Sequence, residues 1–244
     1  MRRGLIALVA AGVVMTAAGN AWTAASPHDA RIASAGGASI DPGNFVRHVT
    51  NPFYPLRSGT LFVYRGTKDG AGQTDRVYVT HRTKRILGVR ATVVRDVATH
   101  GSRVLERTLD WFAQDRAGNV WYLGEATREF LPNGHVSTEG SWEAGVHGAR
   151  PGIVMEADPR APDGYRQEFY AGHAEDQAWV LRRGITVVVP YGRLHRGLRT
   201  LEWTPLEPGV IDKKAYAWGV GLVSEESATG PRETAELVRI RRPQ

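Results

Sequence analysis

Residues 104–125 read VLERTLDWFAQDRAGNVWYLGE and carry the clearest structural pattern in the chain. Apolar residues such as Leu109 and Trp111 share one parity, whereas polar residues such as Asp110 occupy most of the other. This period of two is typical of a half-buried antiparallel strand. Residues 115–119, DRAGN, supply a turn, because Gly and Asn tolerate a positive φ. The stretch therefore predicts a β-hairpin.

Short runs of strand-forming residues continue on both sides of this hairpin. They are separated by about 10–15 residues with local turns, and no apolar period of 3.6 is sustained for three turns. Gly219 and Gly221 interrupt one run and suggest a bent strand, as in a curved sheet. The sequence predicts an all-β fold: a single antiparallel curved sheet or barrel. The further strands are expected at residues 61–64, 77–80, 91–94, 165–170, 178–181, 185–189, 198–204, 215–223 and 235–240.

The amino-terminal end has the pattern of a secretory signal. Arg2 and Arg3 precede an uncharged stretch at residues 5–18, which is shorter than the ~20 apolar residues of a membrane-spanning helix. Small residues follow and offer cleavage sites. We expect residues 1–25 to be a signal peptide, 26–50 a flexible linker and 51–242 a single β domain. The mature protein is then secreted or associated with the cell envelope, without a transmembrane span.

Composition excludes several kinds of site. The chain of 244 residues has no Cys, which excludes disulfides, thiol catalysis and thiolate metal sites. Its net charge is +6, and nearly all of its basic residues are Arg, a bias that also follows from a GC-rich genome. The basic residues are dispersed along the chain, so nucleic acid is not an expected partner. An exported protein would instead meet anionic envelope polymers or lipid headgroups.

Acidic residues concentrate in the middle of the chain. Residues 106–176 hold thirteen acids and six Arg, a net of −7, whereas the remaining residues carry a net of +13. Several Trp and Tyr residues fall in the same third. Two interpretations are open. Acidic and basic strands could lie side by side and neutralise each other, or the acidic third could form an aromatic-lined cleft for a cation, a sugar or another polar small molecule.

A long irregular stretch, residues 133–164, lies within this acidic third and is expected to form a lid-like loop. Trp142 could plug the end of the core or stack on a ligand. Glu143 could be solvated, orient that ligand or act as a general base. The predicted ligand-binding residues are Asp110, Trp142, Glu143, Tyr165, Glu168 and Asp176.

The sequence leaves the activity open. The favoured function is a binding protein that takes a small ligand or an envelope polymer in a concave β face. A secreted hydrolase with paired carboxylates from residues 106–176 is the alternative, and the separation of the carboxyls would decide its chemistry. A structural envelope protein without a ligand is the third possibility. The chain has no GxSxG motif, phosphate loop or compact His pattern, so we expect no metal or cofactor, and we expect a monomer.

Four motifs resemble those of an uncharacterised group of exported bacterial β-rich proteins. They are DWFAQD at 110–115, GNVWYLGE at 118–125, GSWEAG at 140–145 and GVGLV at 219–223. The resemblance covers about residues 51–240 and implies export and a β-rich fold. The last motif also resembles one in secreted curved-sheet proteins that hold apolar ligands.

Overall fold

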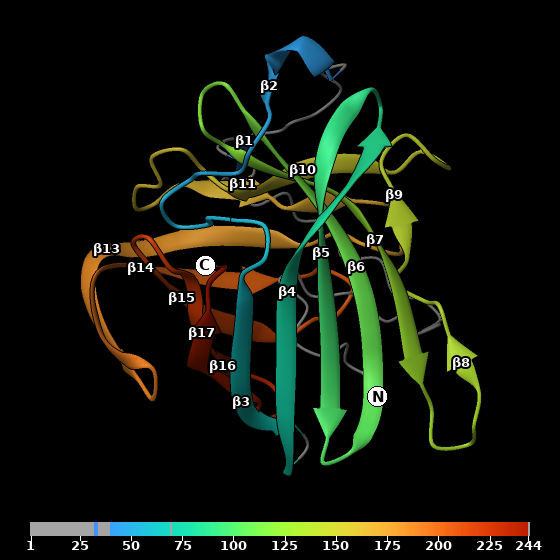
Figure 1. The fold of residues 1–244 in the computed structure, drawn as a ribbon, viewed down its shortest axis with the longest axis vertical. Helices are drawn as coiled ribbons and strands as arrows, with labels where there is room; N and C mark the ends of the chain where they lie inside the picture. Colours follow the sequence, from blue (N-terminus) through green and yellow to red (C-terminus); the bar gives the residue numbers. More distant parts are fainter. Residues whose placement is uncertain (1–31, 34–39, 69, 244) are drawn as a thin grey trace.

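The computed structural model describes residues 32–33, 40–68 and 70–243. In this part every regular element is a β-strand, apart from one short 3-10 helix, which confirms the predicted all-β fold (Figure 1). None of the described helical residues forms a segment long and apolar enough to cross a membrane. The predicted signal peptide, residues 1–25, lies outside the described residues.

The elements follow one another along the chain with short connections. They are β1 (Ile32–Ala33), η1 (Pro42–Asn44), β2 (Phe45–Val46), β3 (Leu61–Lys68), β4 (Ala71–Ile86), β5 (Val89–His100), β6 (Arg103–Asp115), β7 (Val120–Phe130), β8 (Val136–Ser137), β9 (Trp142–Glu143), β10 (Arg150–Met155), β11 (Gly164–Arg166), β12 (Glu168–Phe169), β13 (Gln177–Val189), β14 (Gly192–Trp203), β15 (Ile211–Ala217), β16 (Gly221–Thr229) and β17 (Thr234–Arg241).

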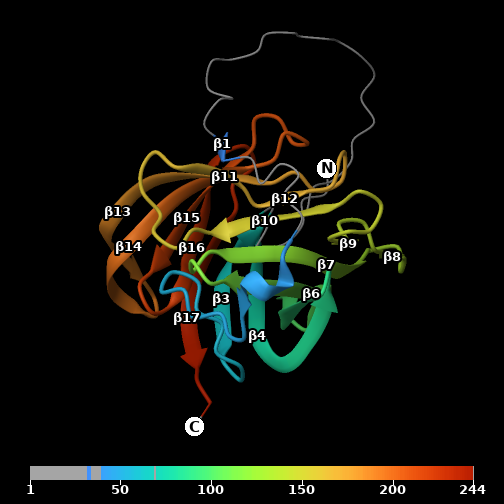
Figure 2. The same cartoon turned by 90° about the horizontal axis from the view of Figure 1, so that it is seen from above.

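The strands form one sheet that curls almost into a barrel (Figure 2). Strands β3 to β7 pair antiparallel in chain order, and so do β13 to β17. β17 pairs with β3 and joins the two halves, while β10 pairs with β7 at the far edge. Figure 1 shows β3 to β7 side by side as one wall, with β13 and β14 running across it. The interior therefore lies between two walls of the same sheet.

The predicted hairpin at residues 104–125 is confirmed. β6 ends at Asp115 and β7 begins at Val120. The Asp115 carboxylate accepts hydrogen bonds from the backbone N–H of Asn119 and the indole N–H of Trp121, each at 2.9 Å. Gly118 adopts φ +101°, which a residue without Cβ does readily. The Asp115 side chain thus stabilises a turn whose backbone conformation requires Gly at position 118.

The bend expected at residues 219–221 is instead a hairpin turn. β15 ends at Ala217, β16 begins at Gly221, and Gly219 and Gly221 have φ values of +76° and +104°. The prediction of one bent strand was wrong because both glycines serve the reversal between two strands. Conversely, the two strands expected at 178–181 and 185–189 are one strand, β13, with register shifts around Gly184.

The stretch at residues 133–164 is more regular than its composition suggests. β9 pairs with β7, and β10 pairs with β7 and β12. Gly124 makes this possible, since a Cβ at that position would lie 2.3 Å from the Trp142 carbonyl oxygen. Part of the expected linker is also ordered: β2 pairs with β6, and Val49 is buried.

Part of the inner face of the sheet is polar where an apolar face was to be expected. An antiparallel strand with one solvated face ordinarily turns its apolar residues inward. In β6, however, Glu106, Thr108 and Asp110 are buried, whereas Leu105 and Leu109 are only half-buried. The period of two is present, but the polar parity of this part of β6 faces the interior.

Aromatic rings fill the centre of the interior between the two walls. Tyr122 stacks on Phe112 with ring centroids 4.9 Å apart, and Trp142 meets Tyr122 edge-on at 5.3 Å. Tyr54 lies 5.3 Å from Phe112 and 6.4 Å from Tyr216, so it bridges the walls. This aromatic layer borders the buried polar residues.

Candidate functional site

A cluster of buried carboxyl groups, here called the acidic interior, occupies the inner face of the sheet next to the aromatic layer. One wall supplies acids from β4 to β7, and the other wall supplies acids from β12 to β16 with a single buried cation. The members are Asp75, Asp96, Glu106, Asp110, Glu125, Glu168, Asp176, Glu202 and Glu225, together with Lys214.

Three of these acids have an Arg neighbour in the chain that faces outward. β4 contains Asp75-Arg76, β5 contains Arg95-Asp96 and β6 contains Glu106-Arg107. Because consecutive strand residues point to opposite faces, the acid of each pair is buried and the Arg is exposed. The two charges of each such pair therefore lie on opposite faces of the sheet. Neutralisation between neighbouring strands, one interpretation of the sequence, does occur elsewhere: Lys214 of β15 pairs with Glu202 of β14, and Lys213 of β15 pairs with Glu226 of β16.

The carboxyls of the β4–β7 wall are only partly hydrogen-bonded. The Tyr122 hydroxyl donates to Asp110 Oδ1 at 2.9 Å. The Thr108 hydroxyl donates to Glu106 Oε1 at 3.0 Å and lies 3.0 Å from the Thr127 hydroxyl. Asp110 of β6 and Glu125 of β7 are direct cross-strand partners, so their two carboxyl groups lie next to each other on the inner face.

The opposite wall centres on Glu202, which is fully engaged. Lys214 Nζ lies 3.0 Å from Glu202 Oε2, and the Gln167 amide donates to the same oxygen at 3.0 Å. The hydroxyls of Tyr216 and Thr200 both donate to Glu202 Oε1 at 2.8 Å. Lys214 is 1% exposed, so this is a buried ion pair that links β14 to β15.

Other polar atoms of the acidic interior have no hydrogen-bond partner within the described chain. A buried polar group left unpaired costs about 1–3 kcal/mol, and more when it is charged. Such groups therefore mark either protonation or a place where a ligand binds. They are both carboxyl oxygens of Asp96, one carboxyl oxygen each of Asp110, Glu125, Glu168, Asp176 and Glu225, and the hydroxyls of Tyr54 and Tyr165.

Burial and mutual repulsion keep these carboxyls protonated to unusually high pH. Burial raises the pKa of Asp110 to about 7, with Glu106 adding to the shift against the lowering effect of the Tyr122 hydroxyl. Burial likewise raises the pKa of Asp75 to about 7. The pKa values of Asp96 and Glu125 are raised well above the ordinary range, by burial first and then by neighbouring carboxyls.

The carboxyls near the other wall follow the same rule. Burial raises the pKa of Glu225 to about 8, although Lys214 opposes the shift. Burial, then Asp176, raises the pKa of Glu168. Those members of the acidic interior whose pKa is raised are therefore mostly neutral near pH 6, and a protonated carboxyl both donates and accepts hydrogen bonds.

Five of the six predicted ligand-binding residues belong to this region. Asp110, Glu168 and Asp176 are acids of the cluster, and Tyr165 is buried close enough to Glu202 for that carboxylate to raise its pKa, after burial itself. Trp142 lies against Tyr122, and its indole N–H lowers the pKa of Glu168, although the two make no hydrogen bond of good geometry.

Glu143 does not belong to the cluster. As the neighbour of Trp142 in β9, it points to the opposite face, where its carboxylate pairs with Lys84 Nζ at 2.6 Å and a third of its side chain is exposed. Lys84 also lies 3.4 Å above the Trp111 ring. Glu143 is thus a partner of a surface Lys.

Several members of the cluster were not found from the sequence. Asp96, Glu125, Glu202 and Lys214 lie far apart in the chain and carry no motif. The signal available for Asp96 was its direct Arg neighbour within a strand, because such a pair must place one charge inside a half-buried sheet. Lys214 had no comparable signal, since Lys213 beside it is also basic.

Two other kinds of site, a metal site and an apolar ligand pocket, find no support in the described residues. No three His, Asp or Glu side chains of the described residues converge as a metal site would require. An apolar pocket of about 20 Å³, lined by Pro55, Val220 and Leu222 among others, has room for about one water molecule. Residues of the GVGLV motif line this pocket, which is too small for an apolar ligand.

Comparison with known proteins gives a fold-level likeness alone. No protein-family model matches the chain, and no curated protein matches it. A solved structure from Bacteroides fragilis, provisionally described as an exported protein with a YmcC-like fold, is 14% identical, with 78% of this chain and 99% of that chain covered and a TM-score of 0.43. One from Parabacteroides distasonis, provisionally described as a lipoprotein, is 12% identical over the same shares, with a TM-score of 0.41. Neither likeness identifies a ligand.

Proposed function

We propose that this chain is an exported, envelope-associated binding protein that holds a small organic cation in its acidic interior. Export rests on the amino-terminal pattern of Arg2, Arg3 and the short apolar stretch that follows. The ligand class rests on the unpaired carboxyl oxygens of Asp96, Asp110, Glu125, Glu168 and Asp176, which face one interior. That concentration of unpaired acids is the observation that carries the proposal.

A bound cation would supply hydrogen-bond partners for the unpaired carboxyl oxygens. Each carboxyl is held neutral by burial and by its acidic neighbours. An ammonium group among them lowers their pKa values, and the ionised oxygens then accept short, charge-assisted hydrogen bonds. Binding is therefore coupled to proton release. The rings of Tyr122 and Trp142 lie beside Asp110 and Glu168 and would contact the apolar part of an alkylamine.

The ligand gains access by movement of the segment that carries Trp142. Between β7 and β10 this segment pairs with β7 through two two-residue strands, β8 and β9, with added hydrogen bonds that join Ser141 and Ala144 to β7. Short pairings of this kind open more readily than the long strands of the walls. The part of the predicted lid-like loop 133–164 that precedes β10 would thus cover the acidic interior, with Trp142 on its inner side.

Hydrolysis is the weaker alternative. The carboxyls of Asp110 and Glu125 lie on facing positions of neighbouring strands, as a catalytic pair requires. However, the two residues are 0% and 3% exposed, so both a substrate and the attacking water would have to enter through movement of the segment that carries Trp142, whereas binding requires entry of the cation alone. Nothing else in the described chain favours a reaction over binding.

Calorimetric titration with spermidine as the probe tests the proposal. We expect the exported protein to bind spermidine with release of protons, counted in two buffers of different ionisation enthalpy, and to bind more tightly at pH 8 than at pH 5. Asp110→Asn and Glu168→Gln should each weaken binding about tenfold or more, since a hydrogen bond to a charged group is worth about 1.5–3 kcal/mol.

Glu143→Gln is the matched control. It removes one acid beside Trp142, on the face of β9 that points away from the acidic interior. It should leave the affinity within twofold. Binding that is insensitive to Asp110→Asn, or binding of a neutral disaccharide such as maltose in place of spermidine, would show that the acidic interior does not select cations.

A further inference from the structure

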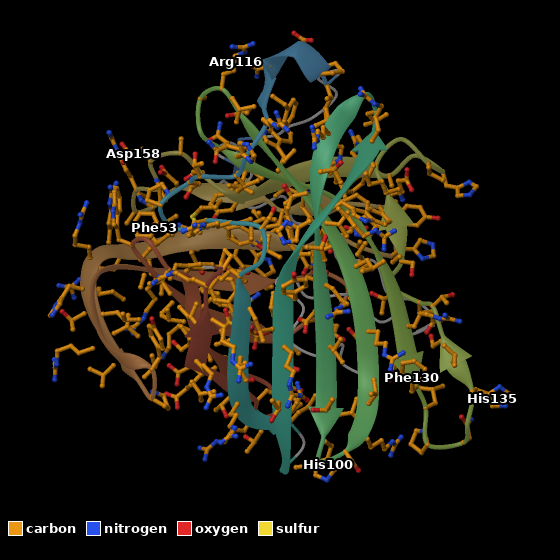
Figure 3. All side chains as sticks on the ribbon, viewed as in Figure 1. Phe53, His100, Arg116, Phe130, His135 and Asp158 are labelled. Carbon is orange, nitrogen blue, oxygen red and sulfur yellow. The ribbon has the colours of Figure 1, made fainter. Side chains whose placement is uncertain are left out.

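The outer face of the β17–β3–β4–β5–β6 wall gathers arginines that are scattered in the sequence. They belong to different strands and are all exposed. In Figure 3, His100 marks the β5–β6 turn at one end of this wall, and Phe130 marks the end of the neighbouring strand β7. The residues, here called the arginine face, are Arg65, Arg76, Arg95, Arg107, Arg239 and Arg241.

Register places five of these side chains in two rows across the strands, and Arg65 lies beside them on β3. Arg239, Val63 and Arg76 are successive cross-strand partners, and Arg107 continues that row beyond β5 through its pairing with Val97. In the second row Arg241 and Arg95 flank Leu61 and Tyr78. Strands lie about 4.7–4.9 Å apart, so guanidinium groups recur roughly every 10–15 Å across the wall.

A groove lies at the β17–β3–β4 end of the arginine face. Its volume is about 350 Å³, and Leu61, Val63 and Val238 contribute its apolar lining. Arg65, Arg76, Arg239 and Arg241 also line it. Four cations around one groove over an apolar floor form a site for an anion that carries an uncharged body.

Few acids oppose this charge. The acids adjacent to Arg76, Arg95 and Arg107 along the chain point inward, into the acidic interior. Glu236, the cross-strand partner of Arg65, is the exposed acid at this end of the wall. Within the described chain, the ion pairs join residues outside the arginine face. No carboxylate oxygen of the described residues lies within 4.0 Å of a guanidinium nitrogen of this face.

We propose that the arginine face binds a linear polyanion, a polymer with repeated phosphate or carboxylate groups, with one unit seated in the groove. The rows extend over several strands and so exceed the size of a small ligand. A bilayer surface is flat and cannot enter the groove, whereas a single extended chain can. Arg suits this role because its planar guanidinium binds both kinds of oxyanion in bidentate fashion.

Binding of two polymer probes tests the proposal. Polyglycerol phosphate and polygalacturonate separate a phosphate from a carboxylate backbone, and dextran is the uncharged control. We expect at least one polyanion to bind, with an affinity that falls as salt rises. Arg76→Gln/Arg239→Gln should weaken binding at least tenfold and reduce the slope of log K against log salt by about 1.4–1.8, if each contact counts as it does on nucleic acid.

Arg182→Gln/Arg193→Gln is the matched control, because both residues are exposed on β13 and β14 and the change in net charge is identical. This control pair should lose less than twofold. Equal losses for the two pairs would show that net charge, rather than the arginine face, governs binding. Binding to neither polymer, or only to phosphatidylglycerol vesicles, would overturn the proposal. Unchanged thermal melts of all variants would show that folding is intact.

Discussion

Lys214→Met is expected to destabilise the protein by about 3–5 kcal/mol at pH 8, the usual cost of breaking a buried ion pair by removing one partner. Lys214 is 1% exposed, and its Nζ contacts Glu202 at 3.0 Å and lies 3.9 Å from Glu225. Burial alone would lower its pKa, but these carboxylates raise it above the ordinary value. Without the ammonium, Glu202 is left as an uncompensated buried charge.

Thermal melts measure this loss. For a domain of this size, 3–5 kcal/mol corresponds to a decrease in Tm of roughly 6–20 °C. The loss should shrink at pH 5, because Glu225 with its raised pKa then takes up a proton and less charge remains unpaired. The double variant Lys214→Met/Glu202→Gln is the control: it removes both charges, and Gln can still accept from Tyr216 and Thr200. It should recover most of the stability. A single variant within 1 kcal/mol of the natural protein at pH 8 would contradict this description of the β14–β15 wall.

Trp142→Ala is expected to cost about 3–5 kcal/mol, as large aromatic truncations in cores do. The residue is 5% exposed, and its ring packs edge-on against Tyr122. Of the two roles open to Trp142 in the sequence, the structure favours packing, and packing does not exclude contact with a ligand bound beside it.

Glu143→Gln controls for effects on the same short strand. Its partner Lys84 is partly exposed, and pairs of this kind contribute about 0–1 kcal/mol. Trp142→Phe keeps an aromatic ring but removes the indole N–H that faces Glu168, so it should cost less than Trp142→Ala and raise the pKa of Glu168 further. A Trp142→Ala variant as stable as Glu143→Gln would mean that Trp142 is not part of the core.

Periodicity predicted the strands well but not which face of them is buried. The alternation in β6 located the hairpin, since it depends on neighbouring residues alone. Whether Asp110 or Leu109 points inward depends on what the opposite wall presents. That wall supplies Glu202, Lys214 and Tyr216, from about 90 residues further along the chain, so local sequence does not contain the answer.

Part of the candidate site could nevertheless have been sharpened from sequence. Trp142 and Glu143 are consecutive residues, and in a strand only one of them can face a given side. Predicting both as ligand contacts required an irregular loop, whereas β9 is a short strand because Gly124 lets its backbone approach β7. Gly124 indicates that another backbone approaches β7 closely at this point. The sequence does not show that the approaching backbone is that of Trp142 and Glu143.

Protonation of the acidic interior also predicts how stability depends on pH. Carboxyls whose pKa is raised in the folded state bind more protons there than in the unfolded chain. Their contribution to the free energy of unfolding is therefore full below about pH 4 and is lost as pH rises through about 7 to 8. Each such group changes the free energy of unfolding by about 1.4 kcal/mol per pH unit between its two pKa values.

Carbon-13 NMR titration of the side-chain carboxyls tests the acidic interior most directly. The signals of Asp75 and Asp110 should titrate near pH 7 and that of Glu225 near pH 8, whereas the exposed Asp158, held by Arg183 and Arg160, should titrate below its ordinary range. Adding spermidine should shift the Asp110 midpoint downward. Midpoints of Asp75 and Asp110 near 4, unchanged by spermidine, would contradict both the neutral acidic interior and the cation site built on it.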